Sequence, residues 1–383
     1  MGRVQDEFEA ATENSALKRA IISRIESEGP ITFRDFMEMA LYHPGLGYYT
    51  CDRPKMDRDG DYLTSPELSP LFGAMIGRQL HELWETMGSP SRFDVVEAGA
   101  GTGALARDIL SWAHRAAPEF ATAVRYQIVE VSAELRRAQL IRLQAEGLSE
   151  QARWSAELPA SVAGCILSNE LLDAMPVRRV LLQNGRLREV CVAWDGVAFG
   201  EELHDPPPDV VAHFDQLGLL PGEGCHAEVN LEAPKWVENA AHSLERGFHL
   251  TLDYGHEADE LYASWRTNGT LLCFYRHNPS TDPYARIGRQ DMTAHVDFTS
   301  IRRAGEEAGL VTLGLTSQSQ FLSNLGITEA LRLPEGSTDI EEHFARRRAV
   351  MELLDPGGLG RIRVLVQAKG VGDVLLTGLK EID

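Results

Sequence analysis

The sequence predicts an α/β fold with a parallel sheet whose two faces are covered by helices. Four apolar runs rich in β-forming residues are predicted to be strands, and stretches of helical composition separate the early ones. This alternation of strands and helices is typical of a parallel sheet. The runs are 93–98, 125–130, 165–168 and 248–253. The first run ends in a turn with three glycines, Gly99, Gly101 and Gly103, before a helical stretch from Ala104. Glycine lets a backbone turn tightly and approach a ligand closely.

The first 90 residues are predicted to be a mostly helical extension. Leu17, Ile21 and Ile25 recur at helical spacing, and Thr32 is placed to cap a second helix. A loop rich in Gly, Pro and Asp is expected over 42–61, and a further helix over about 69–87.

The middle of the chain breaks the alternation of strands and helices. Asn184-Gly185 and Asp195-Gly196 separate β-rich runs, which is the strongest local signal for hairpins. An antiparallel inserted subdomain is therefore expected over 177–245. The remaining chain, 246–383, ends with a predicted helix and two strands. These elements are expected at 298–308, 311–315 and 362–368, and the predicted divisions are 1–90, 91–176, 177–245 and 246–383.

Composition excludes several classes of function. The formal net charge of −20 over 383 residues opposes nucleic-acid binding, which depends on Lys and Arg. Five scattered cysteines indicate a reducing compartment, and no Cys/His spacing suggests a metal site. No apolar run is long enough for a membrane span, and the acidic N-terminus resembles no targeting signal, so a cytoplasmic protein is expected.

Two ligands compete for the glycine turn. The Gly99-x-Gly101-x-x-Ala104 spacing satisfies the dinucleotide pattern, which is weak evidence alone. S-adenosylmethionine also needs close backbone approach, together with carboxylates for its hydroxyl and amino groups. Glu97, two residues before the turn, favours S-adenosylmethionine, because it could face the amino acid part of that ligand. Glu130, at the end of the next strand, suits the ribose of either cofactor.

Other polar clusters follow predicted strands at the same sheet edge. Asn169, Glu170 and Asp173 follow the strand at 165–168, and the two acids would share one face of a helical turn. Such a pair can orient a protic nucleophile, although first-turn acids also simply stabilise a helix. Asp253-Tyr254-Gly-His256 could belong to the site or form a simple turn. Thr64 to Glu67 could be a loop over the site or a capping box of a helix. His295 could be a catalytic residue or a structural hydrogen-bond donor.

Six motifs occur together in one order. They are Tyr42-His-Pro-Gly-Leu-Gly-Tyr-Tyr49, Gly60-Asp-Tyr-Leu-Thr-Ser-Pro-Glu67, Glu97-x-Gly-x-Gly-x-Gly103, Ser168-Asn-Glu-Leu-Leu-Asp-Ala-Met-Pro176, Asp253-Tyr-Gly-His256 and Thr293-Ala-His-Val-Asp-Phe298. In this combination the chain resembles the MidA family of class I S-adenosylmethionine-dependent methyltransferases, over about residues 15–370. Mitochondrial members of that family are protein arginine methyltransferases that assist complex I assembly. With six motifs as context, an NAD oxidoreductase becomes the minor alternative.

The resemblance implies a seven-stranded Rossmann-like sheet and S-adenosyl-L-methionine as cofactor. It places the cofactor along the glycine turn and beside the Thr64–Glu67 loop. The implied cofactor residues are Glu97, Gly99, Gly101, Gly103, Glu130, Thr64, Ser65, Pro66, Glu67 and Asn169. Many relatives have Leu-Gly-Pro-Gly where this chain has Ala98-Gly-Ala-Gly101, but both glycines remain.

The expected function is methylation of arginine on a protein substrate. A guanidinium presents a rigid fork of donors that suits carboxylates, so Glu170 and Asp173 would hold it. Tyr254 completes the expected catalytic set and, with Asn169, would line the channel. Two alternatives are a small-molecule methyltransferase and a non-catalytic assembly factor on the same fold. No nucleic-acid or membrane partner is expected, and the oligomeric state stays open, with a homodimer as one option.

Overall fold

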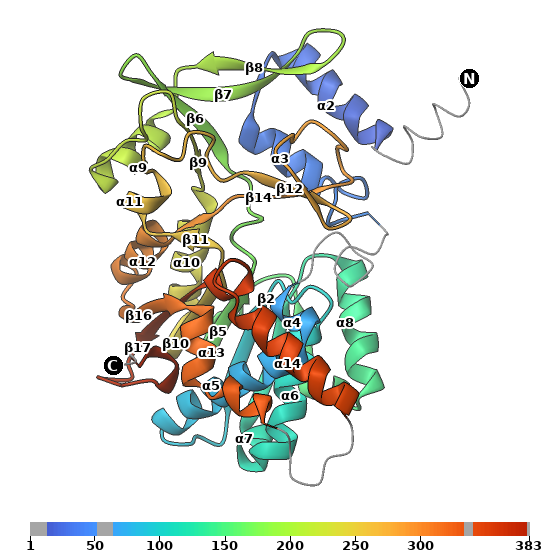
Figure 1. Ribbon diagram of the computed structural model, residues 1–383, viewed down its shortest axis with the longest axis vertical. Coiled ribbons are helices and arrows are strands. Elements are labelled where there is room, and N and C mark those ends of the chain that lie inside the picture. The colour runs from blue at the N-terminus through green and yellow to red at the C-terminus, as the bar shows by residue number, and fades with distance from the viewer. Residues whose placement is uncertain (1–13, 52–63, 333–339, 381–383) are drawn as a thin grey trace. The chain divides into compact units, whose positions relative to one another are not determined.

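The computed structural model describes residues 14–51, 64–332 and 340–380 (Figure 1). Within it the chain forms two compact units. Unit 1 comprises Met1–Tyr62, Leu172–Lys235 and Gly255–Ile301, and unit 2 comprises Leu63–Leu171, Trp236–Tyr254 and Arg302–Asp383. The segment 177–245, expected as an insertion, thus contributes most of its residues to unit 1, together with parts of the N-terminal extension and of the segment 255–301.

Unit 2 is built on a seven-stranded sheet, as the resemblance implied. Its strands lie in the order β16-β17-β10-β5-β2-β3-β4. Their bounds are β16 Val311–Ser317, β17 Arg363–Lys369, β10 Leu244–Asp253, β5 Val162–Asn169, β2 Phe93–Ala98, β3 Val124–Val129 and β4 Ala152–Ser155. β17 runs antiparallel to both neighbours, and the other pairs are parallel. This is the sheet of a class I methyltransferase.

Both faces of this sheet are buried. Val95 and Val96 are adjacent on β2, and successive side chains of a strand point to opposite faces. Val95 joins a core cluster with α5 and α6, whereas Val96 joins one with Ala240 and Ala241 of α10. The helices that belong wholly to unit 2 are α4 Ser65–Leu68, α5 Pro70–Thr86, α6 Ala104–Ala116, α7 Pro118–Ala123, α8 Ala133–Ala145, α13 Gln318–Asn324 and α14 Ile340–Leu354. α10 Glu232–Ser243 and α12 Phe298–Glu307 cross unit boundaries.

Unit 1 confirms the expected antiparallel strands. β6, β7 and β8 form two successive hairpins, with turns at Asn184-Gly185 and Asp195-Gly196. Asn184, Gly185 and Gly196 all have positive φ, as such turns require. The strands of this sheet are β1 Ile31–Thr32, β7 Arg186–Trp194, β6 Arg178–Gln183, β9 His226–Val229 and β8 Phe199–His204. Outside this sheet, unit 1 also contains α9 Pro208–Leu217, α11 Ala258–Leu261, β11 Gly255–His256, β12 Leu272–Tyr275, β13 Asn278–Ser280, β14 Asp291–Thr293 and β15 Val296–Asp297.

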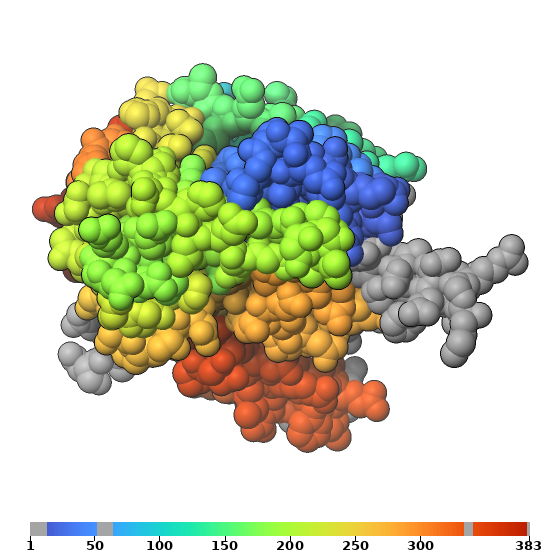
Figure 2. Space-filling view, turned by 90° about the horizontal axis from the view of Figure 1, so that it is seen from above, coloured from blue at the N-terminus to red at the C-terminus, as the bar shows by residue number. Residues whose placement is uncertain are grey.

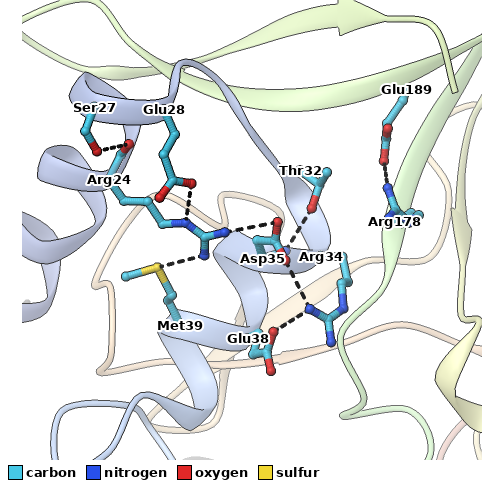
Figure 3. Close-up of polar contacts among 10 residues, drawn as sticks. All are labelled: Arg24, Ser27, Glu28, Thr32, Arg34, Asp35, Glu38, Met39, Arg178 and Glu189. Atoms are coloured by element: carbon cyan, nitrogen blue, oxygen red, sulfur yellow. Dashed lines mark hydrogen bonds and ion pairs between the residues drawn. The ribbon is translucent and has the colours of Figure 1, made fainter. Parts of the chain in front are cut away.

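Two helices complete unit 1, α2 Ser15–Glu28 and α3 Phe33–Tyr42. Both were expected, and the Thr32 hydroxyl caps α3 by accepting from the Asp35 N–H at 3.1 Å. Arg24 of α2 pairs with Glu28 of the same helix at 3.0 Å and with Asp35 of α3 at 3.5 Å, so the second ion pair joins the two helices (Figure 3). Figure 2 shows the surface of α2 and α3 in blue, next to the green β7–β8 hairpin and the orange segment around β12 and β13.

Candidate active site

The sheet of unit 2 changes winding direction between β2 and β5. From β2 the chain continues to β3 and β4 on one side, and from β5 to β10 on the other. In open α/β sheets, ligands bind at the carboxyl ends of the strands at such a switch point. Here the loops after β2 and β5 touch. A Cβ atom on Gly99 would lie 2.7 Å from Cδ1 of Leu171, and Gly99 has a φ of +68°, so only glycine fits.

The glycine turn is held by backbone hydrogen bonds. The Gly99 N–H donates to the Val129 carbonyl at 3.0 Å, and the Gly103 N–H donates to the Ala100 carbonyl at 2.8 Å. Gly101 and Gly103 also have positive φ. α6 begins directly after the turn and has no side-chain cap hydrogen bond in the described structure. The first N–H groups of this helix are therefore available to a ligand.

Glu97 lies at the end of β2 and is buried, with 3% of its surface exposed. The Tyr126 hydroxyl of β3 donates to its Oε2 at 2.6 Å. Burial raises the pKa of Glu97 to about 7, with the Tyr126 hydrogen bond acting against this shift. Glu97 therefore stands at the predicted sheet edge, with Tyr126 as a partner that sequence reasoning did not identify.

Glu130 follows β3 and is also buried. Its Oε1 accepts from the Ser132 N–H at 2.9 Å, and its Oε2 accepts from Nε2 of Gln139 at 3.3 Å. Burial raises the pKa of Glu130, and these hydrogen bonds oppose the rise. A carboxylate has about four acceptor positions, so two hydrogen bonds leave capacity for ligand hydroxyls.

Gln139 and Trp154 also contribute to this site, although the sequence did not predict them. Gln139 of α8 is fully buried and donates to the Gly101 carbonyl at 2.9 Å as well as to Glu130. The Trp154 indole of β4 donates to its Oε1 at 2.9 Å. One signal was available, because Gln139 lies four residues before Leu143, the other buried residue of α8.

The segment after β5 differs from the expected helical turn. No helix begins at Glu170, whose φ of +51° is left-handed and costly for a residue with a side chain. Its N–H donates to the Leu252 carbonyl at 2.8 Å, and the Leu171 N–H donates to the Asp253 carboxylate at 3.1 Å. These contacts end the strand in a bend, so the prediction that Glu170 and Asp173 share a helical face was wrong.

The remaining catalytic candidates fall in different places. Tyr254 belongs to unit 2, where Arg361 lies over its ring at 5.4 Å and its N–H donates to Asp253 at 2.9 Å. Asp173 belongs to unit 1. His256 and His295 also belong to unit 1, with ring centroids 5.1 Å apart.

The expected cofactor loop forms a short helix, α4. Residues 60–63 of its motif lie outside the described residues. Thr64 makes no capping hydrogen bond, and the buried Ser65 donates instead to Gln318 at 3.1 Å, so a simple capping box is excluded. Pro66 is buried beside it. Glu67 pairs with Arg142 of α8 at 3.1 Å and accepts from the Thr102 hydroxyl in the glycine turn.

Within the described ranges, no cluster of three or more His, Cys, Asp or Glu side chains is suited to a metal ion. The same ranges contain no helix of the length and apolarity that a membrane crossing requires.

Comparisons with known proteins agree with this geometry. A sequence profile described as "Putative S-adenosyl-L-methionine-dependent methyltransferase" matches residues 75–316. A Drosophila melanogaster protein named protein arginine methyltransferase NDUFAF7 homolog, mitochondrial, is 31% identical, covering 94% of this chain and 87% of its own. Its human counterpart is 28% identical over 82% of this chain and 74% of its own. A Burkholderia thailandensis crystal structure with bound S-adenosyl-homocysteine matches with a TM-score of 0.87 and 35% identity, covering 95% and 94% of the two chains.

These relatives correct one expectation. The Drosophila and human relatives are named as mitochondrial proteins, which contradicts the cytoplasmic location predicted from composition. Location depends on targeting segments that a folded catalytic domain does not need, so composition is a poor guide to it. For the fold and the cofactor, the profile, the relatives and the solved structure agree with the sheet and the glycine turn. The chain belongs to this family of S-adenosylmethionine-dependent methyltransferases.

Proposed function

We propose that this methyltransferase modifies arginine side chains of a protein substrate. The names of the relatives support this substrate class. The observation that carries the proposal is Glu170, a carboxylate on strained backbone at the switch point of the sheet. Strained residues persist where the surrounding structure enforces them, and they cluster at active sites.

The residues present fit S-adenosylmethionine. Asn169 donates through Nδ2 to Glu170 at 3.0 Å, but within the described chain its buried Oδ1 accepts no hydrogen bond. A buried acceptor without a donor is costly, and a ligand N–H or O–H group would satisfy it. Glu130 would hold the ribose hydroxyls, and Glu97 would face the amino acid part. The glycine turn, Thr64 and the α4 residues Ser65, Pro66 and Glu67 would line the rest of the site.

The bound cofactor supplies a methyl group activated by a positively charged sulfur. The tasks left to the chain are positioning and electrostatics. Glu170 would accept hydrogen bonds from the guanidinium and keep one nitrogen aimed at the methyl group. Tyr254, the residue that follows β10, would shield this nitrogen from water. Asp173 belongs to unit 1, and its contribution remains a prediction from the sequence.

Labelled S-adenosylmethionine tests this proposal. The purified enzyme is incubated with protein extract from cells lacking it, and methylarginine is then quantified after acid hydrolysis. We expect the intact enzyme to produce methylarginine. Glu170→Gln should lower the rate of methylarginine formation by at least about 100-fold, and its affinity for S-adenosylhomocysteine should stay within a few fold of that of the intact enzyme. This combination is expected when a removed group acts in turnover and not in cofactor binding. Glu146→Gln, an exposed acid on the same unit, is the matched control.

Two results would overturn parts of the proposal. Label found only in small molecules would replace the protein substrate by a small one. Loss of S-adenosylhomocysteine binding in Glu170→Gln would move Glu170 from the acceptor to the cofactor.

A further inference from the structure

We propose that Gln139 is a positioning residue that couples the glycine turn to the Glu130 carboxylate. Its Nε2 lies 2.9 Å from the Gly101 carbonyl and 3.3 Å from Oε2 of Glu130. One amide group therefore bridges the two segments that approach the cofactor from β2 and β3. This inference rests on the proposed role of Glu130 in holding the ribose.

The orientation of the amide is fixed by Trp154. An indole N–H can only donate, so the atom it faces at 2.9 Å must be the amide oxygen of Gln139. The amide nitrogen must then point to Gly101 and Glu130, where both partners are acceptors. All three hydrogen bonds of this amide are consistent with one orientation, and the reversed one would set donor against donor and acceptor against acceptor.

The aliphatic part of Gln139 supports the turn as well. A Cβ atom on Gly103 would lie 3.2 Å from both Cα and Cγ of Gln139, and Gly103 has a φ of +82°. The glycine turn thus packs on the aliphatic part of the Gln139 side chain, while the Gly101 carbonyl accepts a hydrogen bond from the Gln139 amide. Gln139 itself is fully buried, and its hydrogen bond to Glu130 is buried with it, which strengthens this contact.

The consequence concerns ribose recognition. A carboxylate that is already oriented loses less conformational freedom when a ligand binds. The Gln139 donor holds Oε2 of Glu130, and the Ser132 N–H holds Oε1, so the plane of the carboxylate is fixed relative to the turn. Without Gln139, the Glu130 carboxylate would lose this orientation.

A double-mutant cycle tests the coupling. S-adenosylhomocysteine affinity is measured by calorimetry for Gln139→Met, Glu130→Gln and the double variant, with Gln144→Met on the exposed side of α8 as the matched control. We expect Gln139→Met to weaken binding about tenfold or more, which corresponds to one lost hydrogen bond to a charged group. In the Glu130→Gln background the same substitution should weaken S-adenosylhomocysteine binding by less than about threefold, because the effects of substitutions at contacting residues are not additive. Gln144→Met should change nothing.

A second readout separates positioning from mere stability. The intact protein should prefer adenosine to 2′-deoxyadenosine, and Gln139→Met should lose this preference, which a general loosening of the fold would not remove selectively. If Gln139→Met does not fold, Trp154→Phe removes only the group that orients the amide. It should then weaken S-adenosylhomocysteine binding severalfold, and only while Glu130 is intact.

The outcomes distinguish the two hypotheses. If the two single-variant losses of affinity multiply in the double variant, the coupling is overturned. Unchanged affinity in Trp154→Phe would overturn it as well. Neither result would affect the proposed role of Glu130. Unchanged affinity in Glu130→Gln overturns the ribose role itself, and the coupling falls with it.

Discussion

The Tyr126 hydroxyl donates a 2.6 Å hydrogen bond to the Glu97 carboxylate between the adjacent parallel strands β3 and β2. Burial raises the pKa of Glu97 from 4.5 to about 7, and it raises the pKa of Tyr126 well above 10. The Tyr126 hydroxyl therefore keeps its proton around neutral pH, where Glu97 changes charge.

The first prediction concerns stability against pH. Because the folded state holds the Glu97 proton up to about pH 7 and the unfolded state releases it near 4.5, stability falls as pH rises through this window. The full effect is about 3 kcal/mol for a shift of this size. Glu97→Gln should remove the dependence. Urea unfolding at pH 5, 6 and 8 measures it, and parallel profiles for the two proteins would contradict it.

His249 gives the opposite dependence. It is fully buried on β10, its ring centroid lies 5.4 Å from that of Trp236, and neither ring nitrogen makes a hydrogen bond within the described chain. Burial lowers its pKa from 6.5 to about 4, and Gln367 of β17 opposes this shift. The unfolded state therefore binds a proton first as pH falls, and stability is lost from pH 6.5 towards 4.

We expect His249→Leu to remove this acid sensitivity. The substitution replaces unsatisfied ring nitrogens by an apolar group, so it should also stabilise the protein by about 1 kcal/mol at pH 8. The advantage of the variant should grow by at most about 1.4 kcal/mol per pH unit below 6.5. Urea unfolding at pH 8, 6.5 and 5 measures it. A constant difference between the proteins would show that folding does not lower the pKa of His249.

The left-handed backbone of Glu170 predicts a separation of stability from activity. Asn tolerates this conformation, whereas β-branched Val does not. Glu170→Asn should therefore keep or slightly raise the free energy of unfolding, while Glu170→Val should lower it by about 1–3 kcal/mol. Both should lose methyl transfer. Equal stability of the two variants would mean that the backbone relaxes freely, and activity in Glu170→Asn would remove the carboxylate from the reaction.

The sequence predicted the elements of the fold better than the contacts between them. Strands such as 93–98 follow from β-branched residues, and the turn that follows needs glycine because Leu171 lies against Gly99. The partner of Glu97 depends on how β2 and β3 align, which no local pattern records. The bend at Glu170 was missed for a similar reason, since it is enforced by Leu252 and Asp253 of another strand.

Gln139 illustrates a different limit. Glutamine usually lies on the surface, so a buried one is identified only when its partners are known. Those partners come from three other segments of the chain, at Gly101, Glu130 and Trp154. Residue types and spacing could place the glycine turn and the two acids at one sheet edge. They could not reveal the amide that joins them.

The last prediction concerns the contact between α4 and α8. Glu67 accepts from Arg142 at 3.1 and 3.3 Å and from the Thr102 hydroxyl, so one carboxylate connects α4, α8 and the glycine turn. Its side chain is 12% exposed, and that of Arg142 is 26% exposed. Hydrogen bonds to charged groups contribute about 1.5–3 kcal/mol in such settings, more than a surface ion pair does.

Glu67→Gln and Arg142→Met should each lower the free energy of unfolding. The double variant should lose at least about 1 kcal/mol less than the sum, because the two side chains share one contact. Both single variants should also weaken S-adenosylhomocysteine binding, since Thr102 loses an anchored partner. Arg137→Met, an exposed arginine on α8, is the control and should change neither quantity. Additive losses would show that the ion pair does not hold α4. Lost stability with unchanged affinity would show that α4 supports the fold without shaping the cofactor site.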